Sequence, residues 1–404
     1  MTAPARARHI ADLLQVHVED LAFLWGQRRE ALGSRKHTLR EYGELNERIE
    51  AHLQGLLVAG PVELTRWLQP QLAGIDRDEV FAAAYALLRL AEADSTHSVV
   101  VEFSRAAGPA LAGLRDALSV APHALFAAEM QSALDQAKPT TAVAAAVVLA
   151  NHRQLDGASP RLARLLEDPD AGVCELAWRA ATVADAVAPL SAPKRPFNHA
   201  LAHAAAGVRS AGWAAAAWSG QTRAMPLLRQ LAASGDATAL HWLAVLGSEE
   251  DVPLLQKAAL ETPDAAARCA LLARFGHPSA LNALLHWMAG DDLALAAAAG
   301  KAFTRITGAE VRGQRRQLPV PEDADDFTRE MAPEVWLPDV PRARALLEHR
   351  GAEWAAGLRW CNGARLDGDH ARELLTQLDL EARWDVAARA ALAGRPVSAP
   401  APIH

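Results

Sequence analysis

The chain has few cysteines and few aromatic residues, and both shortages exclude classes of protein. Its three cysteines, Cys174, Cys269 and Cys361, are far apart and odd in number, so they support neither a disulfide framework nor a CxxC metal knuckle. Only 2 Tyr and 8 Phe occur in 404 residues, whereas alanine dominates an apolar share of 51%. Because alanine is the strongest helix former, this composition favours closely packed helices. No run of alternating β-branched residues predicts a sheet.

The sequence also lacks long apolar runs and an excess of positive charge. The longest apolar run, Ala142–Ala150, has half the length of a membrane span, and the N-terminal stretch has no apolar region typical of a secretory signal. We therefore expect a cytoplasmic protein without a membrane partner. The net charge is −7, and basic and acidic residues are equally numerous over 139–307. This balance disfavours nucleic acid as the partner, because a phosphate-binding groove normally carries excess positive charge.

Familiar catalytic signatures are missing as well. The sequence contains no GxSxG, HExxH or GxGxxG, and Gly300-Lys301 lacks the earlier glycine and the following Ser or Thr of a phosphate-binding loop. No metal or cofactor is therefore expected. The missing motifs favour a binding protein over an enzyme, although an active site without a local signature stays open.

Four segments in the middle of the chain repeat one pattern. Each begins with glycine, passes through small or polar residues, reaches a Leu-Leu pair and is followed by an alanine-rich stretch. They are Gly157–Leu166, Gly220–Leu228, Gly247–Leu255 and Gly276–Leu285. The last two intervals are 27 and 29 residues, and the first, of 63, leaves room for a diverged copy. A period of about 30 with two helical stretches predicts an all-α fold of the α-solenoid type.

Apolar periodicity and proline content divide the chain into four predicted regions. Residues 1–60 predict two helices in a hairpin, residues 61–307 the solenoid, and residues 342–404 further helices with a disordered tail. Residues 308–341 combine a basic cluster, an acidic cluster and several prolines, which predict an extended connector rather than a long helix. Within the second region, Asp76 is a predicted N-cap, and Asp168-Pro169-Asp170 predicts the start of a second repeat helix.

The predicted hairpin contains the densest set of polar residues. They are His17, Glu19, Arg28, His37, Arg48 and His52. Arg48 and His52 share a helix face at i,i+4, whereas His17 and Glu19 lie on different faces. We expect these side chains to tie the two helices together by charge-assisted hydrogen bonds. A partner-binding surface or, at lower weight, a metal or catalytic site are the alternatives.

Three tryptophans recur at about the length of one repeat. Trp178, Trp213 and Trp242 are 35 and 29 residues apart, so equivalent positions would form a ladder in a solenoid. Either these side chains fill gaps between alanine-rich helices, or they form an aromatic stripe that anchors a protein partner.

The layout of Leu165–Ala180 resembles short bacterial HEAT-like repeats, which implies the solenoid fold. The stretches His17–Leu32, Leu39–Gly60 and Pro338–Leu392 resemble an uncharacterised proteobacterial HEAT-repeat family whose members tend to lie in type VI secretion gene clusters. That resemblance implies a context without defining a chemistry. The HEAT-type di-iron hydroxylases need paired His-Glu dipeptides, and this sequence has none.

The expected function is therefore a non-catalytic protein-binding scaffold that acts as a monomer. The resemblance implies a chaperone, adaptor or immunity factor for a secretion effector or spike protein. Two alternatives remain: a small-ligand-binding or lyase-like HEAT-repeat enzyme, and, less favoured, a nucleic-acid-binding solenoid.

Overall fold

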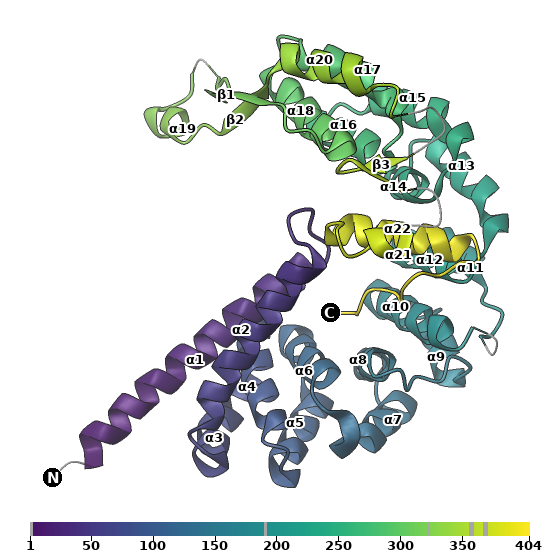
Figure 1. Ribbon diagram of the computed structural model, residues 1–404. Coiled ribbons are helices and arrows are strands. Elements are labelled where there is room, and N and C mark those ends of the chain that lie inside the picture. Colours follow the sequence, from purple (N-terminus) through teal and green to yellow (C-terminus); the bar gives the residue numbers. More distant parts are fainter. Residues whose placement is uncertain (1–2, 190–191, 322, 355–358, 367–370) are drawn as a thin grey trace. The chain divides into compact units, whose positions relative to one another are not determined.

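The computed structural model describes residues 3–189, 192–321, 323–354, 359–366 and 371–404 (Figure 1). It is predominantly helical, as the alanine-rich composition predicts. The chain divides into two compact units, of which the first comprises Met1–Gly220, Asp379–Ala387 and Ala391–His404. The second comprises Gln221–Leu378 and Ala388–Ala390. This division lies inside the predicted solenoid region 61–307 rather than at one of its ends.

The first unit starts with a helical hairpin, α1 (Ala3–Ala31) and α2 (Leu39–Leu57), and continues with a row of buried helices. Each row helix packs on the next; they are α4 (Arg77–Arg89), α6 (Gly108–Val120), α8 (Pro139–Asn151), α10 (Ala171–Val187) and α12 (Ala206–Trp218). Other helices alternate with them along the chain: α3 (Pro61–Leu68), α5 (Ala93–Arg105), α7 (Ala127–Gln136), α9 (Pro160–Leu165) and α11 (Phe197–Leu201). Helix α22 (Leu380–Leu392) lies mostly in this unit.

Local signals place the helices of the hairpin. Thr38 caps α2 in a capping box, because the Glu41 amide donates to the Thr38 hydroxyl and the Glu41 carboxylate accepts from the Thr38 amide at 2.7 Å. The apolar stripe of α2 is buried as its spacing predicts. In α1, the Trp25 ring stacks on Phe81 of α4 at 3.8 Å between centroids, which joins the hairpin to the buried row.

The repeat segments fold into helix pairs. In the second unit the pairs are α13 (Met225–Ala233) with α14 (Ala237–Leu246), α15 (Val252–Glu261) with α16 (Ala265–Phe275), and α17 (Leu281–Met288) with α18 (Leu293–Thr307). Helix α16 also packs on α14 and α18. An aspartate caps the second helix of every pair: Asp236, Asp264 and Asp292, and Asp170 at α10 of the first unit. The capping aspartate is thus a repeated element of the pattern.

The predicted extended connector contains a β-ribbon. Strands β1 (Arg312–Gln317) and β2 (Glu334–Pro338) pair antiparallel around the short helix α19 (Asp326–Glu330). This corrects the expectation that no segment forms a sheet. No periodic pattern predicts the ribbon, because β1, with the sequence RGQRRQ, is almost wholly exposed and has no alternating apolar face. Backbone pairing and the contact of β2 with α18 hold the ribbon in place.

The predicted C-terminal helical region is also interrupted. Helices α20 (Val340–Arg350) and α21 (Ala371–Leu374) flank a two-stranded hairpin of β3 (Trp360–Cys361) and β4 (Ala364–Arg365). Its turn is Asn362-Gly363, and both residues have positive φ, of 49° and 75°. An Asn-Gly pair favours this tight turn, so the dipeptide was a usable signal. Residues 355–358 and 367–370 of this predicted region lie outside the described residues.

The tail that we expected to be disordered is docked on the first unit at its last residues. Ile403 is 4% exposed and belongs to the apolar core of that unit. The Asn151 side chain accepts a hydrogen bond from the Ile403 amide at 3.1 Å and donates one to its carbonyl at 2.9 Å. The composition of the tail predicts disorder. Asn151, which holds the tail, lies some 250 residues away in sequence, so no local pattern could reveal the docking.

Candidate functional site

The predicted polar cluster of the hairpin divides into separate contacts. His17 of α1 and His52 of α2 face each other with their Nδ1 atoms 3.2 Å apart, and His52 Nδ1 lies 3.6 Å from Asp20. Gly55 makes room for this contact, since a Cβ there would lie 2.7 Å from the His17 ring. These contacts are of the kind expected for residues that tie the two helices together.

The other four cluster residues do not join these two histidines. His37 Nδ1 lies 3.1 Å from the Ser34 hydroxyl. Glu19 is exposed and accepts a hydrogen bond from Gln15, and Arg48 is exposed on α2. Arg28 lies further along α1, where its guanidinium is 4.8 Å from the Trp25 ring and 4.6 Å from the Tyr42 ring. It also contacts Asn46 and His404. The predicted cluster therefore does not form a single site.

The described part of the chain shows no metal-binding set of side chains, and two of its cysteines have raised thiol pKa values. No group of three or more His, Cys, Asp or Glu side chains there is arranged to hold a metal ion. Burial raises the thiol pKa of both Cys174 and Cys269 to about 11, so both remain protonated at neutral pH. Protonated, buried thiols act as small core residues.

The tryptophans predicted as a partner-binding stripe occupy different environments. Trp178 and Trp213 are 0% and 1% exposed, and the Trp178 indole donates a hydrogen bond to the Leu166 carbonyl. Trp242 on α14 is half-buried beside His241. With their rings inside the first unit, Trp178 and Trp213 offer no surface to a partner, and their positions match the gap-filling alternative.

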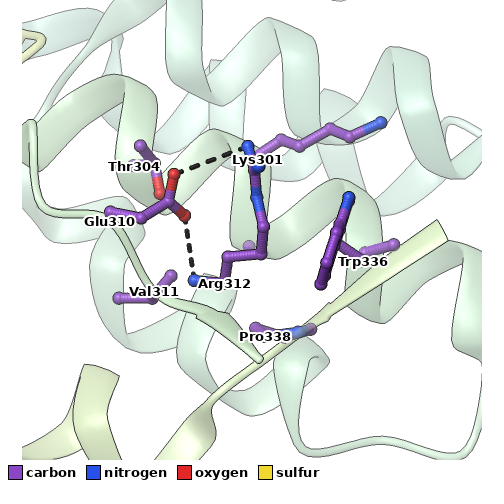
Figure 2. Close-up of a pocket in the computed structure, with 9 residues that line it drawn as sticks. Lys301, Thr304, Glu310, Val311, Arg312, Trp336 and Pro338 are labelled. Carbon is purple, nitrogen blue, oxygen red and sulfur yellow. Dashed lines mark hydrogen bonds and ion pairs between the residues drawn. The ribbon is translucent and has the colours of Figure 1, made fainter. Parts of the chain in front are cut away.

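A pocket in the second unit brings together residues that sequence reasoning did not combine (Figure 2). Its volume is about 170 Å³, and it lies where the ribbon meets α18. The lining residues are Ala297, Gly300, Lys301, Thr304, Glu310, Val311, Arg312, Trp336 and Pro338. Gly300 sets the depth, because a Cβ there would lie 3.0 Å from Pro338. A larger residue would push β2 away from α18.

The pocket has an apolar interior and a charged rim. In Figure 2, Glu310 turns toward Arg312, and Trp336 stands on the wall formed by β2. The Arg312 amide donates to Glu310 at 2.9 Å, and its guanidinium lies 3.5 Å from the same carboxylate and 5.3 Å from the Trp336 ring centroid. Lys301 is exposed at the rim. The lining thus carries two cationic side chains and one carboxylate, which leaves one net positive charge.

The arginines of β1 extend this charge along the ribbon. Arg315 pairs with Glu334 at 2.8 Å and lies 6.0 Å from the Trp336 ring, and Arg316 is exposed. A β-bulge between Arg312 and Arg315 places both near the same indole. Among the described residues β1 pairs only with β2, so charged side chains also protect its open edge from non-specific pairing. Edge protection alone does not require a tryptophan that is 44% exposed.

Two features of the sequence pointed toward this pocket without identifying it. The first is the basic run Arg312–Arg316, which lies in the predicted connector. The second is the dipeptide Gly300-Lys301, which has the form of an incomplete phosphate-binding loop. Their proximity depends on the pairing of β1 with β2, which no local pattern predicted.

Comparison with known proteins gives no relative for this chain. No family model, curated protein or solved structure matches it. None of the described helices combines the length and the hydropathy that crossing a membrane requires.

Proposed function

We propose that this chain is a non-catalytic protein-binding scaffold of HEAT-like repeats, from the family associated with type VI secretion gene clusters. Within each unit, buried helices stack on one another, and an aspartate caps the second helix of each pair in the second unit and α10 of the first. Repetition of one helix pair at about 30 residues supports the solenoid arrangement. The proposed role is that of a chaperone, adaptor or immunity factor for an effector or spike protein.

The observation that carries the proposal is the pocket beside Trp336. Pockets for small molecules and cofactors commonly enclose about 300–1,000 Å³. At about 170 Å³, this pocket suits a single side chain of a partner better than a cofactor. Partner residues that contribute most to affinity commonly enter such pockets, next to aromatic and arginine side chains. Trp336 and Arg312 supply both residue types here.

The lining indicates the chemistry of the partner. The interior is formed by Gly300, Val311 and Pro338, and it favours an aliphatic side chain. Lys301 and Arg312 at the rim, with Arg316 on the ribbon, favour carboxylates next to that side chain. The partner therefore presents an aliphatic residue flanked by Asp or Glu.

The test is binding of the purified full-length chain to each protein encoded beside its gene, measured by isothermal titration calorimetry. We expect one of them to bind, and Trp336→Ala and Arg312→Glu each to weaken binding about tenfold or more. The matched control is Arg344→Glu on α20, which changes an exposed charge away from the pocket and should leave the affinity unchanged.

Two results would overturn the proposal. If no neighbouring gene product binds, the assignment to a secretion partner fails. If a partner binds and both pocket variants retain its full affinity, the scaffold role survives but the pocket does not carry it.

A further inference from the structure

We propose that the first unit has a second binding site, a groove for an extended peptide, and that the chain's own residues 399–404 occupy it as an intramolecular ligand. This inference shares with the proposed function only the idea that the ligand is a polypeptide. It involves neither the ribbon nor the pocket of Figure 2.

The first observation is the way Asn151 holds Ile403. The carboxamide at the end of α8 contacts both the amide and the carbonyl of one residue, at 3.1 and 2.9 Å. One side chain thereby satisfies both backbone groups of a residue that lies outside any helix or strand. Asn151 thus recognises the backbone of the bound residue and not its side chain, so any extended segment can make this contact.

The second observation is that two anchors, Ile403 and His404, follow an exposed stretch of chain. Ile403 is buried in the core, and the His404 ring packs edge-on to Trp25 at 5.1 Å between centroids. His404 Nε2 also lies 3.2 Å from the Arg28 guanidinium. By contrast, residues 393–396 are exposed. Ile403 and His404 therefore hold a segment that an exposed stretch joins to α22.

The third observation is that the site continues beyond these anchors. A cavity of about 550 Å³ shares Trp25 and Arg28 with the tail, and Glu47, Phe81 and Tyr85 are among its other lining residues. Close by, Trp25 Nε1 and Tyr42 Oη of the groove are buried and have no hydrogen-bond partner in the described structure, and the same holds for His404 Nδ1 of the docked segment. The chain's own segment therefore leaves polar atoms of the groove unsatisfied, and a partner peptide that supplies acceptors there would bind more tightly.

The expected ligand follows from these contacts. It is an extended segment with a branched aliphatic residue at the position of Ile403, followed by a ring that packs on Trp25 and accepts from Arg28. A short flexible tether gives an intramolecular ligand an effective concentration in the millimolar range. A partner must therefore compete with the tail, which makes the tail an autoinhibitory segment.

The test uses a fluorescently labelled peptide of residues 395–404 and fluorescence anisotropy. The proteins are the full-length chain, a variant that lacks residues 399–404, and full-length Ile403→Asp, which should release the tail. For a peptide with a Kd of about 10 µM, we expect about 100-fold tighter binding to the two variants than to the unaltered chain. In the shortened chain, Asn151→Ala should weaken binding about tenfold, whereas the matched control Asn282→Ala on an exposed face of α17 should not.

Circular dichroism of each variant separates binding from folding. The inference fails if the folded variants do not bind the peptide, or if Asn151→Ala has no effect. It also fails if both the deletion and Ile403→Asp unfold the protein, because the tail is then an integral part of the core. Since the probe comes from this chain, failure to find a secretion partner would leave the result of this experiment unaffected.

Discussion

The buried helix row of the first unit and the β-ribbon of the second use the same kinds of residue in opposite ways. In the row, Trp213 is 1% exposed. Asp116, which is 0% exposed, pairs with two arginines. On the ribbon, Trp336 is 44% exposed, and the Arg315–Glu334 pair is open to solvent. An aromatic or charged residue in the row stabilises the fold, whereas the same residue on the ribbon remains available to a partner.

The largest expected contrast is between the two tryptophans. Trp213→Ala should lower the free energy of unfolding by about 3–5 kcal/mol, because it removes a fully buried ring and leaves a cavity. Trp336→Ala should lower it by less than about 1 kcal/mol and act on partner binding instead. Urea unfolding followed by circular dichroism measures both. Equal losses for the two variants would remove the distinction between row and ribbon.

The ion pairs test the same comparison with charge. Asp116 accepts from Arg77 at 2.6 Å and from Arg115 at 2.9 Å, so Asp116→Ala leaves two arginines without their carboxylate. We expect a loss of about 3–5 kcal/mol, as is usual when one partner of a buried pair is removed. Glu334→Ala on the ribbon should change stability by about 0–1 kcal/mol. A small effect of Asp116→Ala would mean that the arginines reach solvent in the folded protein.

Gly300 tests whether the ribbon is held by close approach to α18. Gly300→Val should lower stability by about 1–3 kcal/mol and abolish the pocket, because its side chain would collide with Pro338. Gly43→Ala on α2 is the control, since nothing lies within 4 Å of a Cβ at that position. There we expect a gain of about 0.5–1 kcal/mol. Thermal unfolding compares the two, and a tolerated Gly300→Val would indicate a mobile ribbon.

The smallest expected effect is the pH dependence of the docked tail. Burial of its ring lowers the pKa of His404 from 6.5 to about 3; Arg28, Arg77 and Arg115 act in the same direction, and Asp116 opposes them. The docked histidine is thus neutral, so docking is strongest above pH 6.5 and weakens as the pH falls toward 3. At pH 5.5 the loss should be about 1.4 kcal/mol.

Fluorescence anisotropy with the 395–404 peptide and the chain that lacks residues 399–404 measures this pH dependence. The affinity for the peptide should fall about tenfold from pH 7.5 to pH 5.5. A peptide carrying His404→Ala is the control, and its affinity should not change with pH. An unchanged affinity for the unaltered peptide would mean that the imidazole is solvated when bound.

Local patterns predicted those parts of the fold that local physics controls. The capping residues Asp76 and Asp170 lie where the sequence placed them, and the apolar stripe of α2 is buried. The ribbon was missed because a strand without an apolar face carries no periodic signal. The docked tail was missed because its few apolar residues reveal nothing about a distant groove. The pocket combines residues from α18, the segment after it and both strands of the ribbon, so it exists only once the ribbon lies on α18.

By itself, the sequence determined the helical class, the repeating helix pairs and the positions of many helix ends, because propensity, capping and amphipathic spacing act within a few residues. Tertiary structure alone decided which tryptophans are buried, which arginines gather around Trp336 and where the tail docks. Those outcomes depend on contacts between segments that are far apart in the chain. Their energies arise from burial and pairing, which no single segment encodes.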